Sequence, residues 1–422
     1  MNINNVKICV IGLGYVGLPL ACEFSKKYKT IGYDILKLRI KELNSFIDKT
    51  KEVESHDLKE LLSQNLILTN KISKIKNYNV YIVTVPTPID RFKKPDLHPL
   101  KTATELVGEV INKNDVVIFE STVFPGCTEE ECVPILEKIS GLKLNKGFYC
   151  GYSPERVNPG DKVNTLTKII KVTSGSNEKA SSFIDKLYKS IIVAGTHKAQ
   201  SIKVAEASKA IENAQRDLNI SFVNELSIMF DKMGIDTNDV IDAASSKWNF
   251  LSFKPGLVGG HCISVDPYYL TYKAESLGYY PEVILSGRRV NDRMPEFIAS
   301  KIIKLLVNKG IKVKGASCLI MGVTFKENCP DLRNSKVFNI YRELKQFGLN
   351  VSCFDPYAIS TEVKKHYNIN LIYKLKKYDS ILLCVSHKDF LSINFDKLKK
   401  SPESVIYDVK SFLSREIVDK RL

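Results

Sequence analysis

Val6-Lys7-Ile8-Cys9-Val10-Ile11-Gly12-Leu13-Gly14-Tyr15-Val16-Gly17 is an apolar run followed by three glycines in the spacing G-x-G-x-x-G. The run predicts a buried parallel strand, and the residues after the glycines predict a helix. Gly12 and Gly14 allow a tight turn and the close approach of a phosphate group, and Gly17 allows the helix to pack against the strand. The N-terminus of that helix would face the pyrophosphate of a dinucleotide.

An acidic residue ends the second predicted strand. Residues 30–34 form this strand, and Asp34 lies 22 residues after Gly12. A carboxylate at this place hydrogen-bonds a ribose 2′-hydroxyl and repels a 2′-phosphate, so we expect the cofactor to be NAD rather than NADP. Further apolar runs at 80–85 and 115–120 continue the alternation of strand and helix. The first part of the chain therefore predicts a parallel, doubly wound sheet.

The middle of the chain predicts one long helix. Residues 198–232 contain no proline or glycine, and Gly234 would end the helix. Residues 236–239 can cap the next helix. We expect the long helix to link two domains and to offer its outer face to a second subunit; the alternative is that its own chain covers it. Apolar residues recur on one predicted face at Phe222, Leu226, Met229, Phe230 and Met233.

The last part of the chain repeats the strand–helix pattern without a glycine fingerprint. We expect it to bind something other than a second dinucleotide. The fold class is α/β, with two doubly wound Rossmann-like domains joined by a long central helix. Strands are predicted at 316–322, 351–355, 380–385 and 405–409, and a helix is predicted at 334–347.

Composition excludes several classes of partner. The formal net charge is +15, but the basic residues come as scattered pairs, so we expect attraction of an anionic substrate rather than nucleic-acid binding. No apolar run is long enough to span a bilayer, and the N-terminus lacks a signal-peptide pattern, so we expect no membrane contact and a cytoplasmic location with reduced thiols. The ten cysteines and six histidines show no ligand spacing, so no metal is expected.

A cysteine loop points to chemistry beyond a simple alcohol oxidation. Residues 259–267 place Cys262 between two glycines and an Asp-Pro pair, which predicts an irregular loop near a ligand. A thiolate could hold an aldehyde as a thiohemiacetal, which can give up a second hydride; the alternative is a buried structural cysteine. Lys209 and Asn213 lie one helical turn apart and could stabilise an oxyanion together, although a solvated helix face would look the same.

These motifs together resemble the UDP-glucose/GDP-mannose dehydrogenase family over essentially the whole chain. The matching segments are residues 10–17, 85–88, 120–123, 153–156, 205–213, 259–262, 322–327 and 331–335. The resemblance implies that the long helix is a dimer helix. It also implies three domains: an NAD-binding domain at 1–196, a central helical dimerisation domain with the cysteine loop at 197–300, and a UDP-sugar-binding domain at 301–422.

The resemblance also implies roles for individual residues. Cys262 would attack the aldehyde, Lys209 and Asn213 would stabilise the oxyanion, Asp266 and Thr122 would hold the catalytic water, and Glu155 would serve thioester hydrolysis. The implied NAD contacts are Gly12, Leu13, Gly14, Tyr15, Val16, Gly17, Asp34, Arg39, Thr87, Thr122 and Arg333. The implied substrate contacts are Glu155, Arg156, Lys209, Asn213, Gly259, Phe325, Lys326 and Lys410.

Two departures from the family pattern bear on the sugar. Pro159 stands where UDP-glucose enzymes usually carry a second glutamate, and Val265 stands where they usually carry a lysine. With His261, these residues are similar to the branch that oxidises C6 of UDP-N-acetylhexosamines for capsule and O-antigen synthesis in bacteria or archaea. Oxidation of UDP-glucose or GDP-mannose is the alternative, and a non-catalytic nucleotide-sugar-binding protein is a third reading. The configuration at C4 of the sugar stays open.

Overall fold

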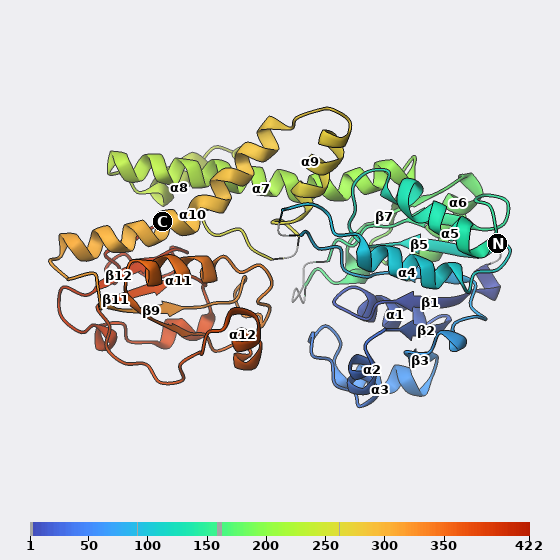
Figure 1. Cartoon of the computed structure of the whole chain (residues 1–422), viewed down its shortest axis with the longest axis horizontal. Coiled ribbons are helices and arrows are strands. Elements are labelled where there is room, and N and C mark those ends of the chain that lie inside the picture. The colour runs from blue at the N-terminus through green and yellow to red at the C-terminus, as the bar shows by residue number, and fades with distance from the viewer. Residues whose placement is uncertain (1–2, 91, 158–162, 261) are drawn as a thin grey trace. The chain divides into compact units, whose positions relative to one another are not determined.

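The computed structural model describes residues 3–90, 92–157, 163–260 and 262–422. The chain divides into two compact units (Figure 1). The first comprises residues 1–212 with 268–279, and the second comprises residues 213–267 with 280–422. Each unit contains its own sheet, mostly parallel in the first unit and fully parallel in the second, as the sequence predicts for the two doubly wound parts of the chain.

The first unit is built on an eight-stranded sheet in the order β3-β2-β1-β4-β5-β6-β7-β8. All neighbours are parallel except β6 and β7. The strands are β1 (Lys7–Ile11), β2 (Lys29–Tyr33), β3 (Leu66–Thr69), β4 (Val80–Val83), β5 (Val116–Phe119), β6 (Tyr149–Tyr152), β7 (Lys171–Gly175) and β8 (Thr196–Lys198). The helices are α1 (Gly17–Ser25), α2 (Lys37–Asn44), α3 (Ser55–Ser63), α4 (His98–Gly108), α5 (Val133–Ser140) and α6 (Glu178–Lys189). The strand order reverses between β1 and β4, where doubly wound sheets bind ligands.

The second unit contains a five-stranded, fully parallel sheet in the order β10-β9-β11-β12-β13. Its strands are β9 (Ser317–Met321), β10 (Asn350–Phe354), β11 (Ser380–Leu383), β12 (Val405–Asp408) and β13 (Lys420–Arg421). Its helices are α8 (Thr237–Ser245), α10 (Glu282–Asn308), α11 (Val337–Gln346) and α12 (Ser360–Tyr367), while α9 (Asp266–Ser276) lies almost wholly in the first unit. The order reverses between β9 and β11, which is the flavodoxin-like arrangement.

The central helix α7 (Ile202–Met233) is unbroken over 32 residues, as the sequence predicts (Figure 1). Gly234 follows it with φ +72°, and the Asp236 side chain caps α8 by accepting the N–H groups of Asn238 and Asp239. The predicted start was early, because residues 196–198 form β8. The predicted start of α11 was also early, because Asn334 has φ +52°, which a right-handed helix excludes.

One face of α7 exposes apolar side chains. At 100° per residue their positions fall within about 40° of one another around the helix axis. They are Val204, Ile211, Phe222, Met229 and Met233, which are 48, 57, 58, 48 and 63% exposed. Leu226 and Phe230, which were predicted on this face, are half-buried.

The glycine pair Gly14 and Gly17 offers a test of the fold and a matched control. A Cβ on Gly17 would overlap the Gly12 carbonyl oxygen and the Thr84 hydroxyl, whereas a Cβ on Gly14 would meet no heavy atom within 4 Å. We expect Gly17→Ala to lower the free energy of unfolding by about 2–4 kcal/mol, since the strand–helix contact must open. Gly14→Ala should stay within about 0.5 kcal/mol of the parent while weakening dinucleotide binding. Thermal denaturation and an NAD titration measure both; equal stability of the two variants would contradict this packing.

Candidate active site

The turn after β1 has the geometry of a phosphate cradle. Gly12 has φ +92° and donates its N–H to the Tyr33 carbonyl, and the space beside Gly14 is open. Asp34 accepts the Leu13 N–H at 2.9 Å on one carboxylate oxygen and the Leu36 N–H at 2.9 Å on the other. Because each carboxylate oxygen has a second lone pair, Asp34 can hold the turn and still accept from a ribose hydroxyl. These residues fit NAD.

Other predicted cofactor residues lie around this turn. Arg39 donates from Nε to the Leu13 carbonyl at 2.9 Å and pairs with Asp48 at 2.8 Å, so its guanidinium braces the turn. Thr87 follows β4, Thr122 follows β5, and the Thr87 hydroxyl donates to the Thr122 carbonyl at 2.7 Å. The carboxyl ends of β1, β4 and β5 thus carry the cofactor candidates of this unit at one edge of the sheet.

Glu155 belongs to a buried charge cluster that the sequence did not predict. The Lys171 ammonium lies 2.6 Å from Glu120 and 3.2 Å from Glu155, and Tyr188 donates its hydroxyl to Glu120. Glu155 also accepts the N–H groups of Arg156 and Val157 at 2.6 and 2.5 Å. Burial alone would raise the pKa of Glu155, but the Lys171 charge and the two N–H donors outweigh it and lower that pKa below its ordinary value.

The other two charges of this cluster respond differently. Burial raises the pKa of Glu120 above its ordinary value in spite of Lys171. Burial would lower the pKa of Lys171, but the two carboxylates outweigh it and raise that pKa. Lys171 is only 2% exposed, so the cluster stays intact through its internal pairing. Glu155 is therefore held as a carboxylate at neutral pH.

Helix α7 carries Lys209, which is 7% exposed, and one turn before it the fully buried Glu206. Glu206 accepts the N–H groups of Gly126 and Thr128 at 2.5 and 2.8 Å, which ties α7 to the loop after β5. Burial raises the pKa of Glu206 to about 7. The predicted substrate residue Arg156 pairs with Glu212 of α7 at 2.8 Å and donates to the Ile170 carbonyl.

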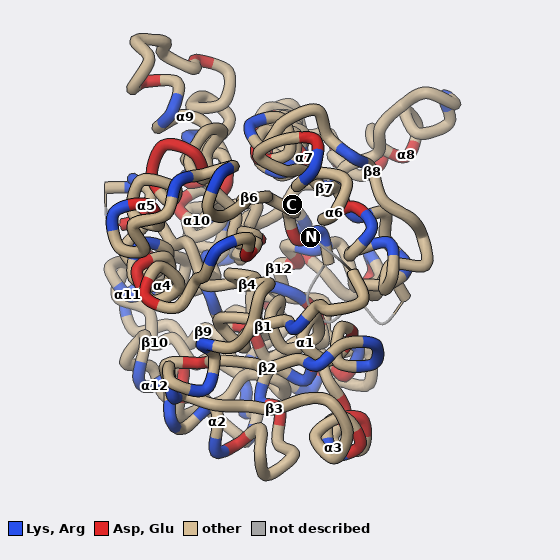
Figure 2. The backbone as a smooth tube through the Cα atoms, turned by 90° about the vertical axis from the view of Figure 1, so that its right-hand side faces the viewer, with Lys and Arg blue, Asp and Glu red and all other residues tan. Residues whose placement is uncertain are grey.

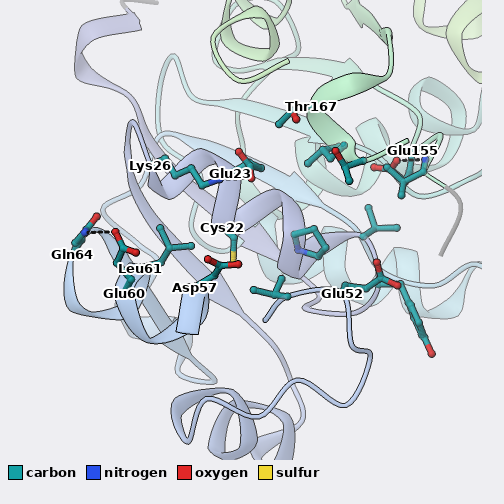
Figure 3. Close-up of a pocket in the computed structure, with 17 residues that line it drawn as sticks. Cys22, Glu23, Lys26, Glu52, Asp57, Glu60, Leu61, Gln64, Glu155 and Thr167 are labelled. Atoms are coloured by element: carbon teal, nitrogen blue, oxygen red, sulfur yellow. Dashed lines mark hydrogen bonds and ion pairs between the residues drawn. The ribbon is translucent and has the colours of Figure 1, made fainter. Parts of the chain in front are cut away.

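A cavity of about 450 Å³ lies beside α1 and α3 and includes Tyr15, Val16 and Glu155 in its lining (Figure 3). Its wall is rich in carboxylates, and Lys26 is already paired with Glu23 at 2.5 Å. This charge suits no phosphate group, so the pyrophosphate of NAD fits the glycine turn and not this cavity. The acidic residues that line it are Glu23, Glu52, Asp57, Glu60 and Glu155.

In the second unit Cys262 opens the turn that starts α9. The Cys262 carbonyl accepts the N–H groups of Val265 and Asp266 at 3.0 and 2.8 Å. Asn213 of α7 donates its amide N–H to the Asp266 carboxylate at 2.5 Å, so two predicted catalytic residues are in contact. Cys262 is half-buried, whereas the other nine cysteines are buried free thiols.

Burial makes five of the buried cysteines poor nucleophiles by raising the pKa of their thiols. It raises the pKa of Cys22 and of Cys318 to about 12, and it raises the pKa of Cys9, Cys150 and Cys384 as well. A thiol with such a pKa stays protonated and unreactive at neutral pH. Cys262 differs from these five thiols in being half-buried.

A small cleft at the β9–β11 reversal brings together three predicted substrate residues, Gly259, Phe325 and Lys410. Ser335 also lines this cleft; it is 3% exposed, and its hydroxyl has no hydrogen-bond partner among the residues that the structure describes. Arg333, a predicted cofactor contact, binds Asp331 in the same unit at 2.6 Å. Val265 is buried, while Pro159 and His261, which also bear on the sugar, lie outside the described residues.

Three further features concern metal binding, membrane insertion and the distribution of charge. In the described part of the chain no group of three His, Cys, Asp or Glu residues could hold a metal ion. No helix there is long and apolar enough to cross a bilayer. Lys and Arg are interspersed with Asp and Glu along the chain (Figure 2).

Comparisons with known proteins identify relatives over the full length. Models of the UDP-glucose/GDP-mannose dehydrogenase family match residues 6–192 as the NAD-binding domain, 203–293 as the central domain and 319–415 as the UDP-binding domain. A UDP-N-acetyl-D-glucosamine 6-dehydrogenase of Salmonella typhi is 52% identical over 100% of this chain and 99% of its own, and one of Pseudomonas aeruginosa is 53% identical over 99% and 100%. The solved UDP-D-ManNAc dehydrogenase of Pyrococcus horikoshii matches with a TM-score of 0.90 and 30% identity, over 99% of this chain and 98% of its own.

The buried Glu206 predicts a pH-dependent stability. Its pKa is about 7 in the folded chain and near 4.5 when unfolded. Between these values the folded chain binds more protons, so the free energy of unfolding should fall by about 3 kcal/mol as the pH rises through this window, and change no further above it.

The measurement compares unfolding of the parent and Glu206→Gln between pH 4.5 and 8. The difference between them should change by about 3 kcal/mol with that sign. Glu105→Gln removes an exposed carboxyl from α4 and should leave the profile unchanged. A flat difference profile for Glu206→Gln would contradict the assignment.

Proposed function

The chain belongs to the UDP-glucose/GDP-mannose dehydrogenase family, and we propose that it is an NAD-dependent UDP-N-acetyl-D-glucosamine 6-dehydrogenase. The reaction converts one CH2OH group, two NAD⁺ and one water into one carboxylate, two NADH and three protons. The observation that carries the proposal is Cys262, the half-buried thiol among ten cysteines, in a turn whose Asp266 accepts a hydrogen bond from Asn213 of α7. When bound, NAD supplies the hydride acceptor for both oxidation steps.

The first unit binds the cofactor in this proposal. The glycine turn and the N-terminus of α1 receive the pyrophosphate, and Asp34 accepts from the ribose. Thr87 and Thr122 line the same sheet edge, and Arg39 braces the turn. Leu13, Tyr15 and Val16 complete the proposed cofactor contacts of this unit, and Arg333 of the second unit is a further proposed contact.

Cys262 carries the second half of the reaction. The first hydride transfer leaves an aldehyde at C6, and the Cys262 thiolate attacks it to form a thiohemiacetal. Lys209 and Asn213 stabilise the oxyanion, since an ammonium and an amide N–H both donate to it. Loss of a second hydride gives a thioester, and water held by Asp266 and Thr122 releases the acid and returns the thiol.

Glu155 serves the hydrolysis as a carboxylate. Its contacts with Lys171 and two backbone N–H groups lower its pKa, so at neutral pH it accepts hydrogen bonds and donates no proton. We therefore propose that Glu155 orients water or the sugar hydroxyls by accepting hydrogen bonds from them. Phe325, Lys326 and Lys410 are the proposed substrate contacts in the UDP-binding part. Gly259 of the central part and Arg156, next to Glu155, are further proposed substrate contacts.

Two observations support N-acetylglucosamine as the sugar. The relatives named for this substrate are 52 and 53% identical to the chain, whereas the solved mannosamine enzyme is 30% identical. Val265 removes the lysine that UDP-glucose enzymes usually carry. The product is an acidic nucleotide sugar for a surface polysaccharide. Free thiols throughout the chain favour a reducing compartment, so we place the enzyme in the cytoplasm.

We keep the division at residues 196 and 300 as a proposal for three functional parts. The family models for the NAD-binding, central and UDP-binding domains support it. The central part holds α7 and the cysteine loop, so it joins dimerisation to the nucleophile.

The stoichiometry tests the function directly. Purified protein with NAD and UDP-N-acetylglucosamine should release two NADH per sugar and yield the uronic acid, and Cys262→Ala should stop net acid formation. UDP-N-acetylgalactosamine, UDP-N-acetylmannosamine, UDP-glucose and GDP-mannose form the comparison panel. Cys318→Ala, in a buried strand, should retain turnover. Absence of NADH with every sugar would refute the proposal.

The exposed apolar face of α7 supports a homodimer built on this helix. A row of five exposed apolar side chains is costly in water and typical of an association surface. Size-exclusion chromatography with light scattering should give the parent a molar mass of twice the 47.6 kDa of the chain. The double variant Phe222→Glu, Met229→Glu should elute as a monomer, because two charges would be buried in the interface. Val193→Glu, at an 88% exposed apolar residue outside α7, should stay dimeric.

A further inference from the structure

The segment 331–335 forms hydrogen bonds with Gly260, at the start of the cysteine loop. The Gly260 N–H donates to the Arg333 carbonyl at 3.2 Å, and the Asn334 side-chain amide donates to the Gly260 carbonyl at 3.0 Å. The Ser264 hydroxyl donates to the same carbonyl at 2.7 Å. Gly260 precedes Cys262 by two residues. Both of its backbone polar groups are therefore bonded, close to the proposed nucleophile, by a segment more than 70 positions away.

Close packing reinforces these hydrogen bonds. A Cβ on Gly259 would lie 2.8 Å from the Asn334 carbonyl oxygen, and a Cβ on Gly260 would lie 2.9 Å from the Phe325 ring. Gly260 also has φ +82°, which other residues rarely adopt. The two glycines therefore let the cysteine loop press directly against the surface that contains Phe325 and Asn334.

The segment 331–335 is itself bonded to residues around the cleft that Gly259, Phe325 and Lys410 line. The Phe325 N–H donates to the Asp331 carbonyl at 3.1 Å, and the Tyr367 hydroxyl donates to the Leu332 carbonyl at 2.9 Å. Ser335 lines the same cleft as Phe325 and Lys410. Neighbouring residues of one short segment thus contact the cleft and the cysteine loop.

Asn334 combines a positive φ with a side-chain amide that can donate to the Gly260 carbonyl. Its φ of +52° lies in the left-handed region, where asparagine is among the few tolerated side chains. Glycine would adopt this backbone at no cost but would leave the Gly260 carbonyl with one donor fewer. Aspartate would keep the shape and the backbone but place a carboxylate against a carbonyl oxygen.

We propose that Asn334 is a positioning residue: its amide fixes the Gly260 peptide, and through it Cys262, to the nucleotide-binding surface of the same unit. In this proposal Asn334 acts on the reaction through the loop. The inference rests on the proposed function, in which Cys262 is the nucleophile. A misplacement of about 1 Å at a reacting group can cost a factor of about 100 in rate, so one amide suffices to matter.

The experiment compares Asn334→Asp and Asn334→Gly with the parent, in the full-length enzyme. Asn350→Asp is the matched control, because Asn350 also donates its amide to a glycine carbonyl, that of Gly315, at 3.1 Å. We measure kcat and KM for UDP-N-acetylglucosamine, the binding of UDP, the melting temperature, and the rate at which iodoacetamide alkylates Cys262, followed on its peptide by mass spectrometry.

Both Asn334 variants should lose about 10- to 100-fold in kcat, while UDP binding changes less than about threefold. The loosened loop should expose Cys262 and speed its alkylation severalfold. Asn350→Asp should match the parent in every readout. The proposal is overturned if kcat and alkylation of both Asn334 variants stay within threefold of the parent, or if the control falls equally. It is also overturned if both variants melt far below the parent, which would mark a structural role.

The test separates this inference from the proposed function. If the parent itself releases no NADH, the proposed function fails. The alkylation rates of the parent and the Asn334 variants then still report whether Asn334 positions Cys262.

Discussion

A carboxylate at the end of the second strand holds the loop after the first strand in both units, and the candidate sites depend on this bond. In the first unit Asp34 accepts the Leu13 N–H. In the second unit Asp355, directly after β10, accepts the N–H groups of Val323 and Thr324 at 2.7 and 3.1 Å. Each bond fixes a loop at the carboxyl edge of a parallel sheet, where the strand order reverses and a ligand can enter.

The two carboxylates, Asp34 and Asp355, suit different ligands because they differ in how many hydrogen bonds their oxygens can still accept. The second oxygen of Asp34 accepts the Leu36 N–H alone. Asp355 accepts N–H groups from Tyr357 and Ala358 on its other oxygen, and His387 faces it at 3.1 Å. Burial would raise the pKa of Asp355, but His387 and these donors lower it. Asp355 is therefore saturated as a carboxylate and leaves no acceptor for a ribose, which agrees with a cleft built for something other than a dinucleotide.

The sequence predicted those parts of the molecule whose structure is determined by a local pattern of residues. The glycine spacing and Asp34 predicted the first turn, and the run without proline or glycine predicted α7 with its end at Gly234. The helix predicted from residue 334 failed because the left-handed Asn334 breaks it, and no local pattern marks such an asparagine. The pairing of Lys171 with Glu120 and Glu155 was also missed, because it joins separate strands whose contacts depend on the sheet order.

Two further missed contacts share one physical form. Glu206 accepts the N–H groups of Gly126 and Thr128, and Asn334 donates to the Gly260 carbonyl, so a side chain far along the chain satisfies the backbone of a functional loop. A loop has no ladder of its own to satisfy its backbone, and a buried backbone group without a partner is costly. A loop that carries a nucleophile must therefore take its partners from elsewhere in the fold. For this reason the residue types of such loops can be read from sequence, whereas the side chains that position them cannot.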